Sequence, residues 1–355
     1  MASDPRTLSI LGATGSIGVN TLDVVRHMGG RDAFEIVALT GSANVHLLAK
    51  QAIEHGVQIA VTADESQYSA LKEALSGTGI NAAAGRQALI DAAAIPADIT
   101  MAAIVGTAGL EPTLAAVKNG GMIALANKEC LVAGGELFMD AVKAAGATLL
   151  PVDSEHNAIF QVLDGEDRSS LERVVLTASG GPFRTWPLEK MANVTVAAAR
   201  AHPNWSMGLK ISIDSASMFN KALEMIEAKH LFALRPEQVE VIVHPQSIVH
   251  SMVAYHDGSI LAQLGPSDMR VAIGYALNHP ERGHLPVERL DFAKLSRLDF
   301  EAPDEARFPA LRLARQAMEQ GGLSGAVLNA AKEVALEAFI AGRLPFLKMA
   351  EVVEK

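Results

Sequence analysis

Leu8-Ser9-Ile10-Leu11-Gly12-Ala13-Thr14-Gly15-Ser16-Ile17-Gly18 is the stretch of sequence that decides the fold. Its apolar beginning is typical of a buried strand, and the residues after it have the periodicity of a helix. Glycines at this spacing allow a tight turn and a close approach of the backbone to a pyrophosphate, which the N-terminus of the helix attracts. The stretch therefore predicts a dinucleotide site, and the alternative is a glycine-rich turn that binds nothing.

The rest of residues 1–150 alternates short apolar runs with amphipathic segments. The runs predicted as strands are 8–11, 35–39, 58–61, 100–105, 122–125 and 148–150. Helix-like segments, such as 20–27, 45–55 and 111–118, lie between them. This alternation indicates parallel βαβ units, so we expect an α/β fold whose N-terminal domain, 1–150, is a Rossmann-like doubly wound parallel sheet that binds the dinucleotide.

The remaining chain is predicted to hold a central α/β catalytic domain with a flexible flap (151–285), a linker (286–308) and a C-terminal helical domain (309–355). In the central domain, strands are expected near 173–177 and 239–244, and a hairpin joins 251–255 to 259–264 through a His-Asp-Gly turn. The last segment is rich in Ala, Leu and Glu.

The end of the second predicted strand indicates which nucleotide binds. An NAD enzyme usually carries an acidic residue there, which holds the ribose 2′-hydroxyl. Residues 39–44 contain none. Because a carboxylate would repel a 2′-phosphate, its absence favours NADPH, with Ser42, Asn44 and His46 as candidates for hydrogen bonds to that phosphate.

Composition excludes some partners. The formal net charge is −10, which argues against nucleic acid or an anionic membrane as a main partner. The apolar runs are shorter than the about 20 residues of a membrane span, and the N-terminus does not resemble a signal peptide. The single cysteine, Cys130, forms no intrachain disulfide, so we expect a cytoplasmic protein.

Two carboxylates form a candidate metal site at the end of the strand predicted at 148–150. Asp153 and Glu155 are two residues apart, so on extended backbone they point the same way. Such a pair binds a hard divalent cation. The alternative is a helix start that Asp153 or Ser154 caps.

A second candidate segment, 213–224, is predicted to be one helix that begins near Asp214 or Ser215. Asn220, Lys221 and Glu224 share one face of that helix. The alternative for Lys221 and Glu224 is a surface ion pair. That alternative does not explain the seryl and Asn residues near the helix start, where an anion is favoured.

Two further segments are predicted to be loops at a ligand site. Residues 177–184 contain the flexible pair Gly180-Gly181, and 202–208 place Trp205 between a proline and a glycine. An aromatic residue in such a loop indicates a lid that excludes water. The alternative is a tryptophan that anchors the loop to the core.

These segments together resemble the 1-deoxy-D-xylulose 5-phosphate reductoisomerase family over nearly the whole chain. The resemblance is carried by 12–18, 124–129, 151–161, 178–183, 202–216, 220–224 and 244–247. It implies an enzyme that converts 1-deoxy-D-xylulose 5-phosphate to 2-C-methyl-D-erythritol 4-phosphate in non-mevalonate isoprenoid synthesis. This enzyme would use NADPH and a divalent cation, Mn²⁺, Mg²⁺ or Co²⁺. It also implies a homodimer that the hydroxamate fosmidomycin inhibits.

The resemblance further implies the roles of single residues. The metal ligands are Asp153, Glu155 and Glu224. The residues at the reacting end of the substrate are Lys128, Ser154, Glu155 and His202, of which Lys128, Glu155 and His202 are expected to be catalytic. The other substrate-binding residues are Ser179, Trp205, Met207, Ser215, Asn220, Lys221 and Ser247. The residues that contact NADPH are Thr14, Gly15, Ser16, Ile17, Asn127, Glu129 and Gly208. Ser42 and Asn44 are added to them from the chemistry at the end of the second predicted strand.

The sequence departs from the family pattern at several positions. Many members carry a basic residue where Ala43 stands, a serine where Cys130 stands and an asparagine where Lys332 stands. The C-terminal helical segment is short for the family, so we expect the third domain to be incomplete.

Two other classes of protein fit part of the sequence. A semialdehyde or acyl-phosphate dehydrogenase also begins with a Gly-Ala-Thr-Gly turn and would use Cys130 as its nucleophile. A buried apolar role is the more common one for such a cysteine. A non-enzymatic NADP-binding regulator would need no metal site, so the three predicted carboxylate ligands argue against it.

Overall fold

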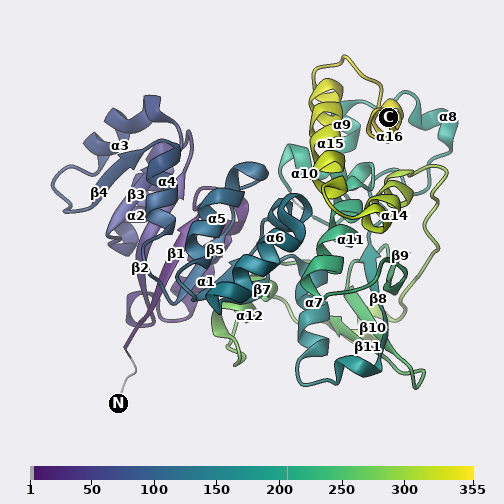
Figure 1. The fold of residues 1–355 in the computed structure, drawn as a ribbon, viewed down its shortest axis with the longest axis horizontal. Helices are drawn as coiled ribbons and strands as arrows, with labels where there is room; N and C mark the ends of the chain where they lie inside the picture. The colour runs from purple at the N-terminus through teal and green to yellow at the C-terminus, as the bar shows by residue number, and fades with distance from the viewer. Residues whose placement is uncertain (1–3, 206) are drawn as a thin grey trace. The chain divides into compact units, whose positions relative to one another are not determined.

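The computed structural model describes residues 4–205 and 207–355. The chain divides into two compact units (Figure 1), and each is assembled from several segments. The first consists of Met1–Cys130, Glu136–Asp153 and Asp268–Val287, and the second of Leu131–Gly135, Ser154–Ser267 and Glu288–Lys355. The division into three domains that the sequence suggested stays a prediction. It differs from these units in two ways: residues 268–285 join the first unit, and residues 309–355 belong to the second unit together with 154–267.

The described part of the first unit is built on one parallel sheet of seven strands in the order β4-β3-β2-β1-β5-β6-β7. The strands are β1 (Arg6–Leu11), β2 (Phe34–Gly41), β3 (Ile59–Thr62), β4 (Asn81–Ala84), β5 (Ile99–Ala102), β6 (Met122–Leu125) and β7 (Thr148–Pro151). The helices that alternate with them are α1 (Ser16–His27), α2 (Val45–His55), α3 (Tyr68–Ala74), α4 (Arg86–Ala93), α5 (Leu110–Val117) and α6 (Glu129–Ala145). The predicted doubly wound α/β fold is therefore confirmed, although the sequence analysis missed β4.

The strand order places the glycine-rich turn where ligands bind in such folds. The chain order reverses at β1, which pairs with β2 on one side and β5 on the other. In open parallel sheets, the crevice at the carboxyl ends of the strands beside this reversal is the usual ligand site. Residues 12–18 follow β1 directly, so they lie at that edge.

A segment distant in sequence completes the first unit. Helix α12 (Arg270–Asn278) follows Asp268. The Arg270 guanidinium pairs with Asp268 at 2.7 Å and with Asp23 of α1 at 3.0 Å, and Arg6 donates to the carbonyl of Leu277 at 2.7 Å. Long-range contacts of this kind have no periodic signal in the sequence.

The described part of the second unit contains a four-stranded sheet in the order β11-β10-β8-β9. Its strands are β8 (Leu171–Ala178), β9 (Val239–Val243), β10 (Val249–Tyr255) and β11 (Ile260–Leu264). The predicted hairpin is confirmed, because β10 and β11 pair antiparallel. The helices are α7 (Ser154–Leu163), α8 (Leu188–Met191), α9 (Val196–Arg200), α10 (Leu209–Ala216), α11 (Phe219–Leu231), α13 (Phe292–Leu295), α14 (Ala310–Gln320), α15 (Ser324–Ile340) and α16 (Lys348–Glu354).

The C-terminal helices share a hydrophobic core with the central segment. Phe183 and Phe219 are buried together with Phe339 and Phe346, and the rings of Phe183 and Phe346 lie 5.3 Å apart. The segment predicted as a linker also contacts this unit, because Glu301 forms an antiparallel bridge with the end of β9. Residues 309–355 therefore belong to the same packed body as 154–267.

The structure corrects the prediction of one helix over 213–224. Helix α10 ends at Ala216, and α11 begins at Phe219. Between them, Met218 has a φ of 64°, a left-handed conformation that stops a helix. Ser215 therefore lies in the last turn of one helix and Asn220 in the first turn of the next.

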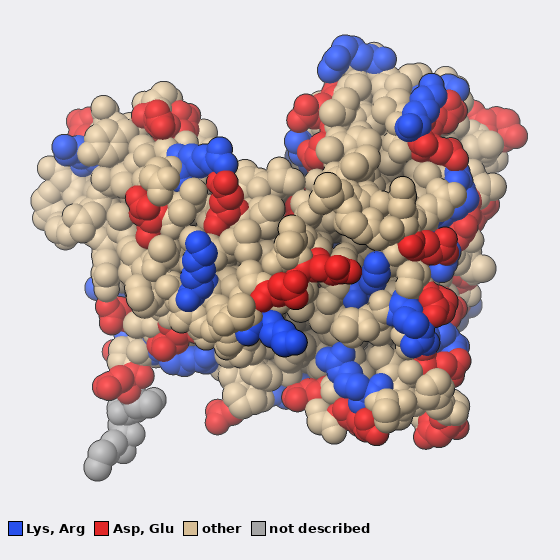
Figure 2. Space-filling model, viewed as in Figure 1, with Lys and Arg blue, Asp and Glu red and all other residues tan. Residues whose placement is uncertain are grey.

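Charged residues of both signs are interspersed on the face that Figure 2 shows. Many form exposed pairs, such as Arg86 and Glu111, whose side chains are 79% and 51% exposed. Such pairs contribute about 0–1 kcal/mol each, so the stability of the fold depends mainly on its cores. No helix in the described residues has the length and apolar character that crossing a membrane requires.

Candidate functional site

The glycine-rich turn of the first unit forms a backbone cradle. Gly12 has a φ of 93°, and a side chain there would lie 2.6 Å from the carbonyl oxygen of Ala103. The amide of Gly12 donates to Thr40 Oγ1 at 2.9 Å. Gly15 is the N-cap of α1 and provides no side-chain cap. The first N–H groups of α1 therefore remain available for an anion such as a pyrophosphate.

The residues after β2 are exposed. Ser42, Ala43 and Asn44 lie on the surface, and Asn44 Oδ1 accepts a hydrogen bond from the amide of Leu47 at 3.2 Å as the cap of α2. The carbonyl of Ser42 accepts from Thr62. The hydroxyl of Ser42 and the exposed edge of Asn44 are thus placed at the carboxyl end of β2, where the ribose of a dinucleotide lies in such folds.

Asn127 joins two loops at the same edge of the sheet. Its amide nitrogen donates to Gly106 O at 2.8 Å and to Ile104 O, and its oxygen accepts from Cys130 N at 3.0 Å. This places Asn127 beside residues 103–106, a loop that follows β5. The sequence analysis had predicted residues 103–105 as the end of a strand. Gly106, at the end of an apolar run, was the signal that could have revealed that loop.

Lys128 and Asp153, predicted from separate motifs, are brought together in the first unit. Lys128 Nζ lies 2.6 Å from Asp153 Oδ2, and both side chains are largely buried. Glu129 begins α6 directly after Lys128. The carboxyl ends of β6 and β7 therefore carry one ammonium group and one carboxylate in contact.

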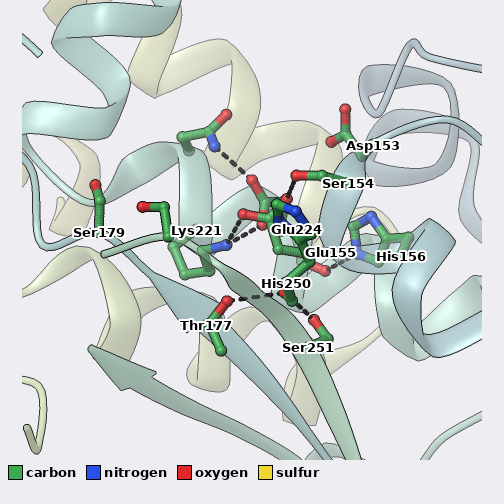
Figure 3. Close-up of polar contacts among 12 residues, drawn as sticks. Asp153, Ser154, Glu155, His156, Thr177, Ser179, Lys221, Glu224, His250 and Ser251 are labelled. Atoms are coloured by element: carbon green, nitrogen blue, oxygen red, sulfur yellow. Dashed lines mark hydrogen bonds and ion pairs between the residues drawn. The ribbon is translucent and has the colours of Figure 1, made fainter. Parts of the chain in front are cut away.

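The second unit contains the other predicted carboxylates, and they converge (Figure 3). Lys221 Nζ lies 2.7 Å from Glu155 Oε1 and also contacts Glu224 Oε2. Asn220 donates to the other oxygen of Glu224, and Ser154 Oγ donates to Glu155 Oε2 at 2.6 Å. Helix α7 supplies Ser154 and Glu155, and α11 supplies the other three. The predicted common face of α11 is therefore confirmed.

The charged side chains of this cluster interact strongly because they are buried. The side chains of Lys221 and Glu224 are 5% and 2% exposed. Burial alone would lower the pKa of Lys221, but the carboxylates of Glu155 and Glu224 outweigh burial and raise that pKa above its usual value. The two carboxylates thus hold one buried cation, the Lys221 ammonium, and carboxylate oxygens are also the ligands that a divalent metal site requires.

A buried His–Glu pair supports this cluster, and the sequence analysis missed it. His156 Nε2 lies 2.9 Å from the carbonyl oxygen of Glu224, and its Nδ1 lies 3.1 Å from Glu227 Oε2, with both side chains buried. His156 directly follows Glu155, and Glu227 is one turn beyond Glu224. That spacing was the available signal. The pair fixes α7 against α11 and therefore the distance between their carboxylates.

The loop after β8 carries Ser179, which contacts His202. Ser179 Oγ lies 2.9 Å from His202 Nε2 and accepts from the amide of Gly181 at 3.1 Å. Burial lowers the pKa of His202, so its imidazole is neutral at neutral pH. A neutral imidazole exchanges donor and acceptor roles between its two nitrogens.

The predicted lid, 202–208, is held by hydrogen bonds. Asn204 donates to Pro245 O at 2.6 Å and to Ser247 Oγ at 2.9 Å, and the amide of Trp205 donates to His202 Nδ1 at 3.0 Å. The ring of Trp205 lies 6.2 Å from that of His250, another residue that the sequence analysis did not single out. Ser206 lies outside the described residues.

Ser215 and α11 form a candidate anion site. A side chain at Gly181 would lie 3.0 Å from Ser215 O, so the loop that carries Ser179 rests against the last turn of α10. Helix α11 has no side-chain cap, and Asn220 and Lys221 stand in its first turn. The positive end of the helix dipole and a lysine at a helix N-terminus attract a phosphate.

The remaining predicted site residues lie in the following elements. Thr14, Ser16 and Ile17 belong to the turn and first residues of α1. Met207 is half-buried, and its carbonyl lies 3.5 Å from Ser212 Oγ. Gly208 caps α10 in the second unit, whereas the other predicted cofactor residues belong to the first.

Comparison with known proteins assigns the family. A family model described as 1-deoxy-D-xylulose 5-phosphate reductoisomerase matches residues 8–135, and two models of its C-terminal domains match 149–232 and 264–355. Proteins of this name from Sinorhizobium fredii and Rhizobium meliloti are each 70% identical over 350 residues, which is 99% of this chain and 90% of theirs. The chain belongs to the 1-deoxy-D-xylulose 5-phosphate reductoisomerase family.

Solved structures of reductoisomerases agree with this assignment. The enzyme from Zymomonas mobilis in complex with NADPH is 54% identical, with a TM-score of 0.93 over 99% of this chain and 90% of that one. A reductoisomerase in complex with NADPH, fosmidomycin and magnesium is 44% identical, with a TM-score of 0.94 over 98% of this chain and 88% of that one. The reductoisomerase fold therefore extends over both units.

Proposed function

We propose that this chain is an NADPH-dependent reductoisomerase that converts 1-deoxy-D-xylulose 5-phosphate to 2-C-methyl-D-erythritol 4-phosphate. The carbon skeleton rearranges to an aldehyde, and a hydride from NADPH then reduces it, as a step of non-mevalonate isoprenoid synthesis. The observation that supports this most directly is the convergence of Glu155, Lys221 and Glu224 in a chain of the reductoisomerase family.

The residues present fit a divalent cation. Glu155 and Glu224 offer carboxylate oxygens that already hold one positive group, the Lys221 ammonium. Asp153 stands two residues before Glu155 and completes the proposed ligand set. When bound, Mg²⁺, Mn²⁺ or Co²⁺ supplies Lewis-acid stabilisation of charge on substrate oxygens.

The chain's own side chains have the following proposed roles at the substrate. Ser179, Ser215, Asn220 and Lys221 bind the phosphate, which the N-terminus of α11 attracts. His202, which is hydrogen-bonded to Ser179, is proposed to contact the reacting end, where its neutral ring can accept a proton. The group that assists at the reacting end consists of Lys128, Ser154 and Glu155.

The lid residues exclude water. Asn204 donates to Ser247 Oγ, which supports the proposal that Ser247 lies at the boundary of the substrate site. Trp205 and Met207 supply apolar surface that would cover the substrate. Exclusion of water protects the aldehyde and strengthens electrostatic interactions inside the site.

The proposed cofactor site is the cradle at the reversal of the strand order. The backbone of Gly15 and the first turn of α1, with Thr14, Ser16 and Ile17, bind the pyrophosphate, and Ser42 and Asn44 bind the 2′-phosphate. The residues assigned to the rest of the nucleotide are Asn127, Glu129 and Gly208. Fosmidomycin, which a related structure contains together with magnesium, is proposed to bind at the metal and phosphate positions.

The activity is tested by following NADPH oxidation with 1-deoxy-D-xylulose 5-phosphate after chelation, with and without added Mn²⁺. Turnover that requires the cation supports the proposal. Glu224→Gln is expected to raise the Mn²⁺ concentration required by about 100-fold or more, since changes beyond the ligands already cost 10–100-fold in metal affinity. The matched control is Glu240→Gln, an exposed carboxylate on β9. A chain that folds and binds NADPH but does not turn over would refute the substrate assignment.

We also propose that the chain forms a homodimer through β11. This strand is an edge of the second sheet, and Ile260 and Leu261 are 54% and 44% exposed. The edge of one copy can pair antiparallel with the same edge of a second copy, as a two-fold interface requires. Light scattering of the wild type and of Ile260→Lys tests this, and a wild-type monomer would contradict it.

The cytoplasm is the proposed compartment. Cys130 is buried and is the one cysteine of the sequence, so the chain gains no disulfide from an oxidising compartment. Cell fractionation followed by immunodetection tests the assignment.

A further inference from the structure

Lys332 is a buried lysine outside the site described so far. It lies in the middle of α15 and is 1% exposed. Its ammonium lies 2.9 Å from Asp214 Oδ2, a side chain that is 8% exposed, and it also contacts Glu333. A buried ion pair usually stabilises a fold no better than apolar residues of the same size. The pair therefore calls for an explanation other than stability.

The location of Asp214 supplies that explanation. It lies in the last turn of α10, directly before Ser215. The turn is closed by Ser217, whose hydroxyl donates to the carbonyls of Ile213 and Asp214. The loop with Gly181 rests against the same turn at Ser215 O. A shift of Asp214 would therefore move Ser215 relative to the loop that carries Ser179.

A second contact ties the other end of α10 to α15. Lys210 Nζ lies 3.0 Å from Glu333 Oε2 and 3.2 Å from Glu337 Oε1. Glu333 is thus shared by Lys332 and Lys210. The Lys210 side chain is 45% exposed, and such exposed pairs are weak. The buried pair of Lys332 and Asp214 is therefore the stronger of the two polar ties between α10 and α15.

The charge of the Lys332 ammonium also matches the electrostatics of the last turn of α10. The last turn of a helix carries unsatisfied carbonyl groups and the negative end of the helix dipole. The helix-end carbonyl groups and the Asp214 carboxylate would each repel a phosphate at Ser215. The ammonium of Lys332 compensates the Asp214 charge at this position, and it does so from outside the proposed phosphate site.

We propose that Lys332 is a positioning residue for the substrate phosphate: through Asp214 it fixes the last turn of α10, and so places Ser215 for phosphate binding. The inference rests on the proposed function, because it assigns a role within the same site. It predicts that loss of Lys332 weakens binding of the sugar phosphate more than it slows the chemical step.

Steady-state kinetics of Lys332→Met, Asp214→Asn and the double variant test this inference. We expect the KM for 1-deoxy-D-xylulose 5-phosphate to rise about tenfold in each single variant, which is the effect of losing one charge-assisted hydrogen bond. The kcat and the KM for NADPH should change less than about threefold. The change in KM in the double variant should differ from the product of the changes in the two single variants, since the residues act as one pair.

The control variant is Lys229→Met. Lys229 also joins two helices of this unit, since it donates to the carbonyl of Met318 in α14 at 2.8 Å. Among the described residues, its side chain forms no hydrogen bond with the turn that carries Ser215. Its KM for the sugar phosphate should stay unchanged. Inhibition by inorganic phosphate gives a second readout, and its inhibition constant should rise in Lys332→Met and stay unchanged in Lys229→Met.

The outcomes separate the two proposals. A wild-type chain without turnover refutes the proposed function. A wild type that turns over, beside a Lys332→Met variant that melts lower but keeps its KM and its phosphate inhibition, refutes the positioning role alone. If Lys332→Met does not fold, the KM and the phosphate inhibition constant of the double variant test the positioning role instead. That variant leaves no buried charge without a partner.

Discussion

Gly18 lies where α1 passes closest to the turn that precedes it. A methyl group at Gly18 would lie 2.4 Å from both Gly12 O and the Cα of Ala13, about 1 Å inside ordinary van der Waals contact. Because both neighbours are backbone, the helix itself must shift in Gly18→Ala. We estimate about 3 kcal/mol for overpacking, less about 1 kcal/mol gained in helix propensity. The net loss of about 2 kcal/mol corresponds to a Tm lower by about 4–8 °C.

Gly15→Ala is the matched comparison. The nearest atom to a methyl group there, Gly12 O, lies at 3.4 Å, so the fold accommodates it. That methyl group would instead face the proposed pyrophosphate. Differential scanning fluorimetry and NADPH titration should therefore give opposite results, with Tm lowered chiefly in Gly18→Ala and nucleotide affinity lowered at an almost unchanged Tm in Gly15→Ala. An unchanged Tm in Gly18→Ala would refute the packing argument.

Three further outcomes are expected. Cys130→Ser should keep most activity, because Cys130 is fully buried, and loss of activity in a folded variant would favour the dehydrogenase alternative. Ala43→Arg should lower the KM for NADPH by up to about fivefold, an effect that salt reduces, without changing the KM for NADH. Burial lowers the pKa of His55, His202 and His250 below 6.5, so the unfolded state binds more protons below that pH. Thermal unfolding should therefore show a constant Tm above pH 7 and a fall between about pH 6.5 and 5, smaller in His55→Gln, and a Tm that stays constant to pH 5 would contradict this.

The sequence predicted the features that local chemistry determines. Strand β6 and helix α2 were predicted with their observed limits, and the turn from Gly12 was placed correctly, because each depends on apolar periodicity or glycine spacing. The common face of Asn220, Lys221 and Glu224 also follows from helix geometry. Family motifs added the assignment of roles, which periodicity does not supply.

Features that depend on tertiary context were missed. Strand β4, Asn81–Ala84, consists mostly of alanine and has no β-branched residue to mark it. The break at Met218 carries no glycine or proline, so the segment was predicted as one continuous helix. The pair of Lys332 and Asp214 joins residues 118 positions apart, and a lysine in a helical segment is ordinarily predicted to be on the surface.

The return of α12 to the first unit has a consequence for synthesis of the chain on the ribosome. Domains usually fold as units while the chain emerges. Here Asp23 meets Arg270 only after most of the second unit has been translated. The nucleotide-binding half therefore remains unfinished while its successor is made, so a fragment ending at residue 153 would lack part of its own body. Supplying 268–287 through a short linker offers a direct way to obtain that half as an independent protein.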